Sequence, residues 1–430
     1  MISKFKDIVG YEEEKEELIN ICNIINNRKE LVKYGCKIPK GLFIVGPNGV
    51  GKTMMANLLI ENIACNVIKI EENDYDTESD FKSYIKEKFS ETCNEEFSIV
   101  YIDEIDKMIG NDYENSLNDN FEKSNVLLNE INKYIDKDNI FLLLVGNDEL
   151  RIGRSLLRSG RIDKVISVNL PNNNEREKII RDYISDKNFS KELDIDEIVS
   201  LTKNRNCATI KCVLNEALIK AYIKNKKEVT QEDVREALFN NINVRKDKNI
   251  NLDKKSLKRL ATHEVSHAVV LIKLGEKEVS KISILGNGDI GGYVMSNETD
   301  RKLYTLKNEE DRIAISLAGY VGEKLYFGNV GVGSVRDLAF ARDKARDLVR
   351  NQAYFGFDKL SSNDMSFDTN PKISNRKLTR MEKCEEKLLK INAKKAKKIL
   401  RKNKKLVDLL IEELVEKKVL YKEEIYRLCK

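Results

Sequence analysis

The stretch GLFIVGPNGVGKT, residues 41–53, decides the fold of the N-terminal half of this chain. An apolar run with β character, residues 41–45, leads into a glycine-rich loop, and the helical pattern MMANLLIENI follows. A phosphate-binding loop needs this order, because its backbone N–H groups wrap the phosphates at a helix N-terminus. Lys52 is expected to reach the β and γ phosphates of ATP, and Thr53 the Mg²⁺ ion. The predicted nucleotide-binding residues of this loop are Gly46, Pro47, Asn48, Gly49, Val50, Gly51, Lys52 and Thr53.

Two further apolar runs end in polar residues that suit the same site. The run 98–102 ends in Asp103 and Glu104, an aspartate that can hold magnesium and a glutamate that can polarise the attacking water. Taken alone, this pair also fits a solvated strand end. The run 140–145 leads into Asn147, whose amide can orient that water. The alternation of strands, loops and helices predicts an α/β module with a parallel sheet flanked by helices.

Two arginines follow in the segment GRSLLRSGRIDKVISVNL. Arg158 and Arg161 are separated by a serine-glycine turn that exposes both side chains. Because they lie far past the magnesium site, they are predicted to act as arginine fingers on the γ phosphate of a neighbouring subunit. A basic surface loop is the alternative.

Both histidines of the 430-residue chain fall in the HExxH stretch 263–267. Four-residue spacing on a helix brings His263 and His267 to one face, where both can bind one metal ion while Glu264 lies beside it. The pattern predicts a zinc hydrolase site. The alternative is a helix that carries two histidines by accident. The flanking residues Leu257, Leu260, Ala261, Val265, Ala268, Val269 and Ile272 are apolar at helical spacing.

Bulk composition narrows the class of protein. The chain is long enough for two or three domains, and 41% hydrophobic residues with 4 prolines indicate a folded, helix-rich protein. A net charge of +5 from 76 basic and 71 acidic residues does not predict a nucleic-acid partner. The eight cysteines form no CxxC pair, which favours a reducing, cytoplasmic location. No apolar run is long enough to cross a bilayer, so no integral membrane segment is expected.

Together these motifs resemble the AAA+ ATPases, and the whole chain resembles the FtsH family of ATP-dependent zinc proteases. The segments FKDIVGYEEEKEEL, IPKGLFIVGPNGVGKT, YIDEIDK, LLRSGRID, LNEALIKAY and HEVSHA occur in that family's order. Past the metal motif the likeness continues through AGYVGEKLYFG, GSVRDLAFARDKARDLV and VLYKEEIYRL. The resemblance implies an AAA+ module followed by a mainly α-helical zinc peptidase domain.

The resemblance also supplies the rest of the metal site. With both histidines used and the cysteines scattered, the third ligand is expected to be a carboxylate, and the family's aspartate matches Asp337. Glu323 matches a family glutamate close to the metal, although an ordinary helix-surface glutamate fits equally well. The implied chemistry is hydrolysis of a peptide bond by a zinc-activated water from which Glu264 takes the proton.

The chain departs from the family pattern in three places. Only four residues precede Phe5 where relatives carry membrane spans, so membrane tethering is not expected. The segment EENDYDTESDFKSYIKEKF lacks the family's aromatic-glycine pore loop, for which Tyr75 or Phe81 is the predicted substitute. NRNCATIKC replaces a glycine-rich segment before the helix that carries Asn215 and Glu216, which would alter the coupling of nucleotide state to lid motion.

The predicted domain organisation has four parts. These are a large nucleotide-binding subdomain over 1–170, a helical lid over 171–240, a linker over 241–256 and the peptidase domain over 257–430. Within the last, a strand pair is expected around 281–284 and 291–295, and in the family an edge strand here aligns the peptide. Gly291 and Gly292 would permit close approach or serve only as turn residues. The basic run 390–405 is better explained as a solvated helix face than as a nucleic-acid site.

The expected function is that of an ATP-dependent zinc endopeptidase that unfolds and degrades proteins. The arginine fingers and the family resemblance imply a homo-oligomeric ring, a hexamer, with Zn²⁺, ATP and Mg²⁺ as cofactors. Two alternatives stay open. One is a remodelling ATPase whose peptidase half is a scaffold or depends on an adaptor, and the other is an AAA+ protein that acts on DNA.

Overall fold

The structure is a computed structural model in which the chain forms two compact units. One contains residues 1–195 and 204–234, and the other contains residues 196–203 and 235–430. The described residues are 4–71, 78–108, 119–135, 137, 139–149, 160–242, 253–275, 278–285, 291–296, 305–352, 354–355 and 375–429. None of the helices in these ranges combines the length and the apolar character needed to cross a membrane.

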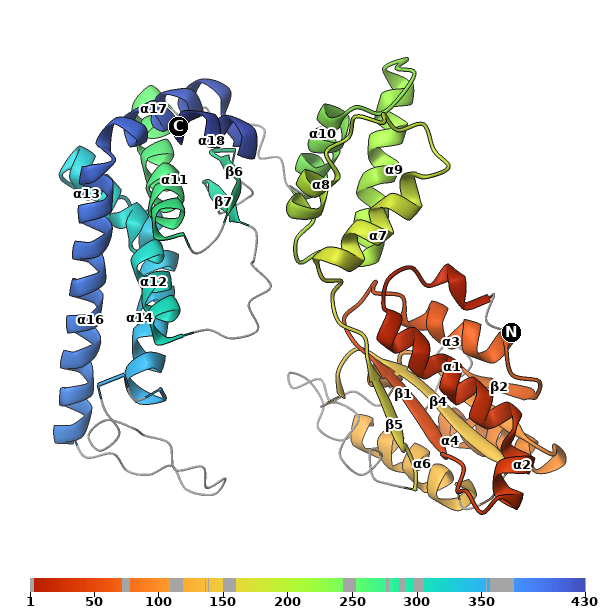
Figure 1. The fold of residues 1–430 in the computed structure, drawn as a ribbon. Helices are drawn as coiled ribbons and strands as arrows, with labels where there is room; N and C mark the ends of the chain where they lie inside the picture. The colour runs from red at the N-terminus through yellow and green to blue at the C-terminus, as the bar shows by residue number, and fades with distance from the viewer. Residues whose placement is uncertain are drawn as a thin grey trace. The chain divides into compact units, whose positions relative to one another are not determined.

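A five-stranded parallel sheet forms the centre of the first unit (Figure 1). Its order is β2-β3-β4-β1-β5, and the strands are β1 (Gly41–Val45), β2 (Asn66–Ile70), β3 (Ser98–Ile102), β4 (Ile140–Gly146) and β5 (Lys164–Ser167). All residues of β1, β3 and β4 are buried, as expected for a sheet covered on both faces. In the register Val45 pairs with Gly146 and Ile102 with Leu144. The residues that follow these strands therefore meet at one edge of the sheet.

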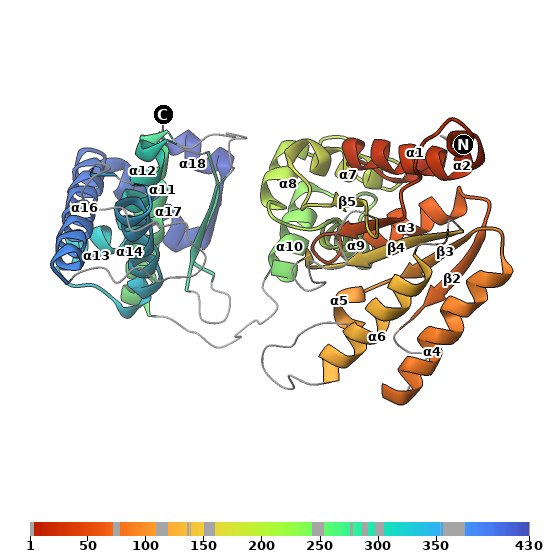
Figure 2. The ribbon, with the colours of Figure 1, turned by 90° about the horizontal axis from the view of Figure 1, so that it is seen from below.

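Helices cover both faces of this sheet (Figure 2). On one face α4 (Glu78–Glu91) and α6 (Asp119–Tyr134) pack against alternate strand residues such as Phe43, Val100 and Leu142. The other face carries α1 (Glu12–Asn26) and α3 (Lys52–Glu61). Two short helices, α2 (Arg28–Lys33) and α5 (Ile105–Met108), complete this part. The predicted α/β fold is confirmed.

The pore-loop prediction is wrong for Phe81. This residue lies in α4 and is fully buried in the core beneath the sheet, so its ring is not free to grip a substrate. Tyr75, the other aromatic residue of that prediction, lies outside the described residues. The physical reason is that Phe81, Ile85 and Phe89 follow helical spacing, so all three side chains face the core side of α4.

Four helices follow β5. They are α7 (Asn173–Ile184), α8 (Ile195–Leu201), α9 (Cys207–Ile223) and α10 (Gln231–Ile242). Asn172 begins α7 with a capping box, in which its side chain accepts from the Glu175 amide. Because α10 continues to Ile242 and α11 begins at Lys254, both ends of the predicted linker 241–256 are helical. Residues 243–252 lie outside the described part of the chain.

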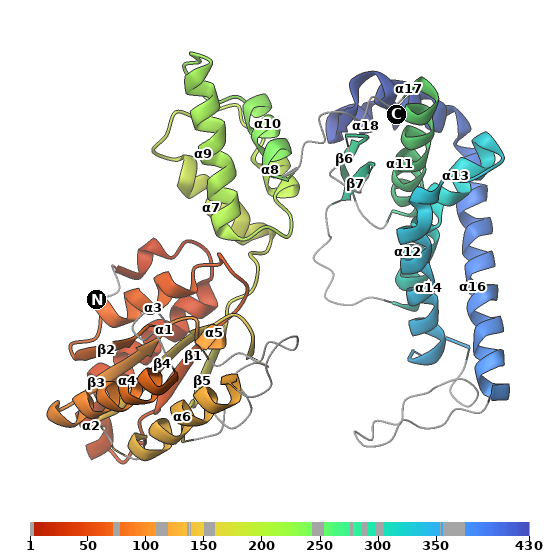
Figure 3. The same cartoon turned by 180° about the vertical axis from the view of Figure 1, so that it is seen from behind.

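The second unit is built around the helix that carries both histidines, α11 (Lys254–Leu274). Its apolar side, with Ala261, Val265 and Ala268, is fully buried against neighbouring helices and β6. Figure 3 shows α14 beside α16, and these helices share a core with α12. The surrounding helices are α12 (Leu306–Ser316), α13 (Ala318–Phe327), α14 (Val335–Arg350), α16 (Asn375–Lys402), α17 (Lys404–Lys417) and α18 (Lys422–Cys429).

A three-stranded antiparallel sheet of order β7-β6-β8 completes this unit. Its strands are β6 (Val279–Ser283), β7 (Tyr293–Ser296) and β8 (Val419–Tyr421). The predicted strand pair is confirmed, and β8 was not predicted. The basic run lies mostly on α16, where Ala396 and Leu400 are buried and the lysines between them are largely exposed. Ile391, an aliphatic residue of the same run, is 43% exposed.

Candidate nucleotide and metal sites

The phosphate-binding loop lies where the sequence placed it, between β1 and α3. Gly49 has φ +76° and Gly51 has φ +107°, backbone conformations that favour glycine. The loop borders a cavity of about 230 Å³ at the carboxyl edge of the sheet. The described residues that line this cavity are Asn48, Gly49, Gly51, Lys52, Thr53, Met54, Asp103, Glu104, Val145, Gly146 and Asn147. The structure therefore brings together predicted residues from three separate segments.

Hydrogen bonds hold the predicted phosphate and magnesium residues in place. Lys52 Nζ donates to Asn147 Oδ1 at 2.9 Å and to the Pro47 carbonyl at 3.0 Å. Burial lowers the pKa of Lys52. Thr53 Oγ1 donates to Asp103 Oδ2 at 3.0 Å, so the two expected magnesium ligands already touch. Because the oxygens of Thr53 and Asp103 already lie in contact, both can bind the same Mg²⁺ ion.

Glu104 has a strained backbone conformation, which is common at functional sites. Its backbone has φ +48°, a conformation that costs energy for a residue with a side chain. Its side chain is exposed and accepts from Lys107 Nζ at 2.6 Å. The neighbouring Asp103 also accepts from the Tyr101 hydroxyl at 2.9 Å, which fixes the direction of that carboxylate.

Asp106 is a site residue that sequence reasoning missed. It is 3% exposed, and its two carboxylate oxygens accept from the backbone and side-chain N–H groups of Asn147 at 2.9 and 3.0 Å. This pairing leaves the Asn147 amide oxygen directed at Lys52. The signal was the position of Asp106 three residues after Asp103, but only the sheet order places it beside Asn147.

Arg161 lies near the amino-terminal ends of the strands, whereas the phosphate-binding loop lies at their carboxyl ends. Its carbonyl oxygen lies 2.8 Å from where a Cβ on Gly41, the first residue of β1, would stand. The loop follows the last residue of β1, and a strand of this length spans about 13 Å. Arg161 is not among the described residues that line the cavity, and Arg158 lies outside the described residues.

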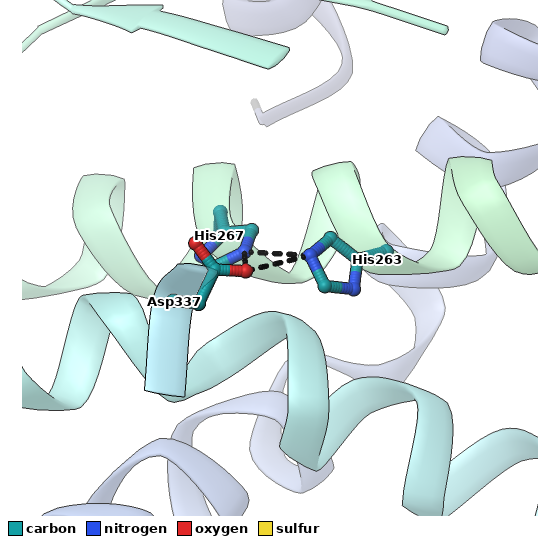
Figure 4. Close-up of side chains that lie close together, drawn as sticks. All are labelled: His263, His267 and Asp337. Atoms are coloured by element: carbon teal, nitrogen blue, oxygen red, sulfur yellow. Dashed lines mark hydrogen bonds and ion pairs between the residues drawn. The ribbon is translucent and has the colours of Figure 1, made fainter. Parts of the chain in front are cut away.

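In the second unit, His263, His267 and Asp337 converge (Figure 4). Both histidines lie on α11, and Asp337 lies in the first turn of α14. The distances are 3.1 Å between the two Nε2 atoms, 3.0 Å from His263 Nε2 to Asp337 Oδ2 and 3.4 Å from His267 Nε2 to the same oxygen. Ligands of a tetrahedral zinc ion lie about 3.3 Å apart, so the donor set and its spacing fit zinc.

The other ring nitrogens have their own partners. His263 Nδ1 contacts Glu323 Oε1 at 2.8 Å, and His267 Nδ1 contacts the Ile315 carbonyl at 2.7 Å. A carbonyl can only accept, so the His267 proton lies on Nδ1 and leaves Nε2 free to bind metal. The Glu323 carboxylate likewise accepts from His263 Nδ1, so a metal ion has to displace only the proton that His263 carries on Nε2.

Burial and charge oppose each other in this cluster. Burial lowers the pKa of His263, but hydrogen bonds to Asp337 and Glu323 outweigh it and raise the pKa to about 10. Burial raises the pKa of Asp337, yet its hydrogen bonds with both histidines hold it well below its usual range. The pKa of Glu323 falls to about 2, because His263, the Gly331 amide and Arg259 outweigh its burial. Both carboxylates are therefore ionised, as metal chemistry requires.

Glu264 stands beside the three converging side chains without joining them. It is 6% exposed, and burial raises its pKa, while the two nearby histidines lower it. Gly292 allows the chain before β7 to approach it, since a Cβ there would lie 2.8 Å from Glu264 Oε1. The close-approach interpretation of Gly292 is thus supported. A buried carboxylate with a raised pKa is suited to accept and return a proton.

A groove of about 1020 Å³ runs past this cluster. Tyr293 and Val294 of β7 line it, together with Leu260 and Leu271 of α11 and Val332 before α14. In the described part of the chain β7 is an edge strand that pairs with β6, and an edge strand is the position at which an extended peptide can add to a sheet. The groove is largely apolar around a polar centre.

Glu323 is not a surface glutamate. It is 3% exposed, and besides His263 it accepts from Arg259 Nη1 at 2.9 Å and from the Gly331 amide at 2.8 Å. Replacing Glu323 by glutamine should weaken zinc binding by roughly 10- to 100-fold, because the negative charge that orients the His263 ring is then absent. Zinc competition against a chromophoric chelator measures this change.

Glu309 provides the matched control for that variant. It is also a buried carboxylate of this unit, with ion pairs to Arg312 and Lys344 at 2.9 and 2.8 Å. Glu309→Gln should lower stability without weakening zinc binding. Equal zinc affinity in the Glu323→Gln and wild-type proteins would contradict the orienting role.

Gly319 makes room for the metal ligands. A Cβ at this position of α13 would lie 2.5 Å from His263 Nε2 and 2.5 Å from His267 Nε2. Gly319→Ala should therefore displace the histidines, cost about 1–3 kcal/mol of stability and abolish stoichiometric zinc binding. Metal analysis after dialysis and thermal unfolding check both effects. Gly333→Ala is the control, since a Cβ there meets nothing within 4 Å, and full zinc content in Gly319→Ala would contradict the prediction.

Comparisons with known proteins identify a family for each half of the chain. The family model described as "ATPase family associated with various cellular activities (AAA)" matches residues 42–170, and the one described as "Peptidase family M41" matches residues 250–428. The chain is 30% identical to an ATP-dependent zinc metalloprotease FtsH of Karelsulcia muelleri, over 98% of this chain and 70% of that protein.

Two further relatives carry related names. ATP-dependent zinc metalloprotease FtsH 2 of a Thermoanaerobacter species is 29% identical over 98% of this chain and 82% of its own length. An FtsH of Caldicellulosiruptor bescii is 30% identical over 85% of this chain and 60% of its own length. With both modules matched in this order, the chain belongs to the FtsH family of ATP-dependent zinc metalloproteases, whose cofactors are zinc, ATP and Mg²⁺.

Proposed function

We propose that this chain hydrolyses ATP to unfold protein substrates and cleaves them at a zinc site held by His263, His267 and Asp337. The observation that carries the proposal is the convergence of these three side chains at zinc-ligand spacing beside the buried Glu264. In the domain scheme that we propose, residues 1–170 bind the nucleotide, residues 171–240 form a lid, and residues 257–430 cleave.

The residues of the peptidase site have separate tasks. Zinc, when bound, polarises a peptide carbonyl and lowers the pKa of a bound water toward neutrality. Glu264 accepts the proton of that water and returns it to the leaving amine, a transfer favoured by the pKa-raising effect of its burial. An extended substrate adds beside β7, an edge strand of the described sheet, and lies across the groove.

The residues of the ATPase site also have separate tasks. Lys52 binds the β and γ phosphates, and Thr53 and Asp103 hold Mg²⁺. Glu104 polarises the attacking water, and Asn147 orients it from its position between Lys52 and Asp106. These roles require Lys107 to release Glu104 and Lys52 to exchange Asn147 for phosphate.

The proposed oligomer is a hexameric ring in which Arg158 and Arg161 reach a neighbour's nucleotide. Arg161 lies beside the first residue of β1, and the phosphate-binding loop follows the last residue of that strand. This position supports action in trans, because the arginine side chain is shorter than the strand and does not reach the loop of its own subunit. FtsH-type proteins act on protein substrates and typically as oligomers, and the ring size is part of the proposal.

The experiment that tests the function follows casein degradation by the purified chain under three conditions. These are ATP with zinc, no nucleotide, and ATP with a zinc chelator. We expect cleavage only under the first condition. ATP turnover without cleavage would reject the coupled protease and favour a remodelling ATPase, and chelator-resistant cleavage would reject the zinc site.

A further inference from the structure

The start of α9 rests directly on the phosphate-binding loop. Asn206 Nδ2 donates to the Asn48 carbonyl at 2.7 Å, and the Ala208 amide donates to the Gly49 carbonyl at 3.0 Å. All four residues belong to the same compact unit. Two hydrogen bonds therefore join two segments that are some 158 residues apart in the chain.

The side chain of Asn206 uses both ends of its amide. Its oxygen accepts from the Thr209 amide at 2.8 Å and so caps the N-terminus of α9. The cap fixes the orientation of the side chain and points the Nδ2 group at Asn48. A serine would supply the cap equally well, but its hydroxyl ends one bond beyond Cβ and cannot span to Asn48.

The loop is shaped to receive this contact. Gly49 has φ +76°, and a Cβ on it would lie 2.6 Å from Asn206 Nδ2 and 3.1 Å from Ala208 Cβ. A third contact is made at the start of the same helix, because the Tyr11 hydroxyl lies 3.4 Å from Cys207 Sγ. The same hydroxyl donates to the Asn169 carbonyl at 3.0 Å. The beginning of α9 is thus bonded to the loop and to the N-terminal segment together.

We propose that Asn206 is a positioning residue that ties α9 to the phosphate-binding loop and thereby slows nucleotide release. The inference rests on the proposed ATPase function. Asn48 and Gly49 line the phosphate cavity, so their backbone cannot move to release a nucleotide without straining or breaking the bonds to Asn206 and Ala208. Because Asn206 both caps α9 and bonds the loop, a movement of this helix also moves the backbone of the loop.

The test compares two serine variants by stopped-flow release of a fluorescent ADP, mant-ADP, from the full chain. Asn206→Ser keeps the cap of α9 and loses the bond to Asn48. Asn172→Ser is the matched control, since Asn172 caps α7 by accepting from the Glu175 amide at 3.0 Å and is not among the residues of the phosphate cavity. Loss of one hydrogen bond predicts a release rate roughly 2- to 10-fold faster in Asn206→Ser, with the control unchanged.

A second variant separates the tie from helix capping. Asn206→Asp keeps the cap and the length of the side chain but presents an acceptor to the Asn48 carbonyl, so release should be at least as fast as in Asn206→Ser. The KM for ATP should rise in both variants, because ATP also dissociates faster, whereas kcat should not fall. Equal release rates in Asn206→Ser and Asn172→Ser would reduce Asn206 to a cap and overturn the inference. Failure of the wild-type chain to bind mant-ADP would instead overturn the proposed ATPase function.

Discussion

Replacement of Glu264 by glutamine should lower the rate of casein cleavage by roughly 10²- to 10⁴-fold while ATP hydrolysis continues. Glutamine has nearly the same size and fits the same buried position, but it cannot take a proton from water. Glu264 is not one of the three converging side chains, so the variant should keep its zinc. Because glutamine preserves the volume of the buried side chain, the variant should also keep its fold.

Three measurements on one preparation make this result decisive. They are zinc content, ATP turnover and the appearance of casein fragments. The reciprocal variant, Glu104→Gln, should lose ATP turnover and retain zinc, which shows that the two modules fail independently. Undiminished cleavage by Glu264→Gln would remove Glu264 from the mechanism.

Asp337→Asn should weaken zinc binding by more than about 100-fold, a larger loss than the 10- to 100-fold expected when a residue that only orients a ligand is changed. The neutral amide is a poor zinc ligand, and the two histidines alone cannot complete the site. Asp337 is held ionised by the histidines that it faces, at 3.0 and 3.4 Å, and asparagine loses that charge. Zinc titration against a chromophoric chelator measures the loss.

Asp343→Asn is the matched control on the same helix. The Asp343 side chain is 72% exposed and forms an ion pair with Arg346 at 3.4 Å, so its replacement should change neither zinc binding nor cleavage. Stoichiometric zinc in Asp337→Asn would show that another group supplies the third ligand. Cleavage activity retained without zinc would reject the metal mechanism altogether.

Local patterns in the chain were enough to predict part of each site. The strand, glycine loop and helix of residues 41–53 are adjacent in sequence, and so are the two histidines of α11. The backbone alone brings such residues together, because a helix places positions four apart on one face. The order of buried strands likewise predicted that Asp103 and Asn147 would meet, since parallel strands end at one edge.

Other features depended on contacts between distant segments. Asp337 follows His267 by 70 residues and came from resemblance to the family and not from spacing. Glu323 fitted a surface helix equally well, until the packing of α13 on α11 placed it against His263. Phe81 was predicted to face substrate and lies in the core, because its exposure depends on how α4 packs against the sheet.

The sequence by itself determined the two chemistries, since the phosphate-binding loop and the HExxH helix are short patterns whose geometry follows from backbone conformation. Only the tertiary structure decided the supporting residues. Asp106 holds Asn147, Gly319 clears space for two imidazoles, and Asn206 reaches Asn48. Each of these depends on the distance between two elements, which is set by the packing of many side chains at once and by no local pattern.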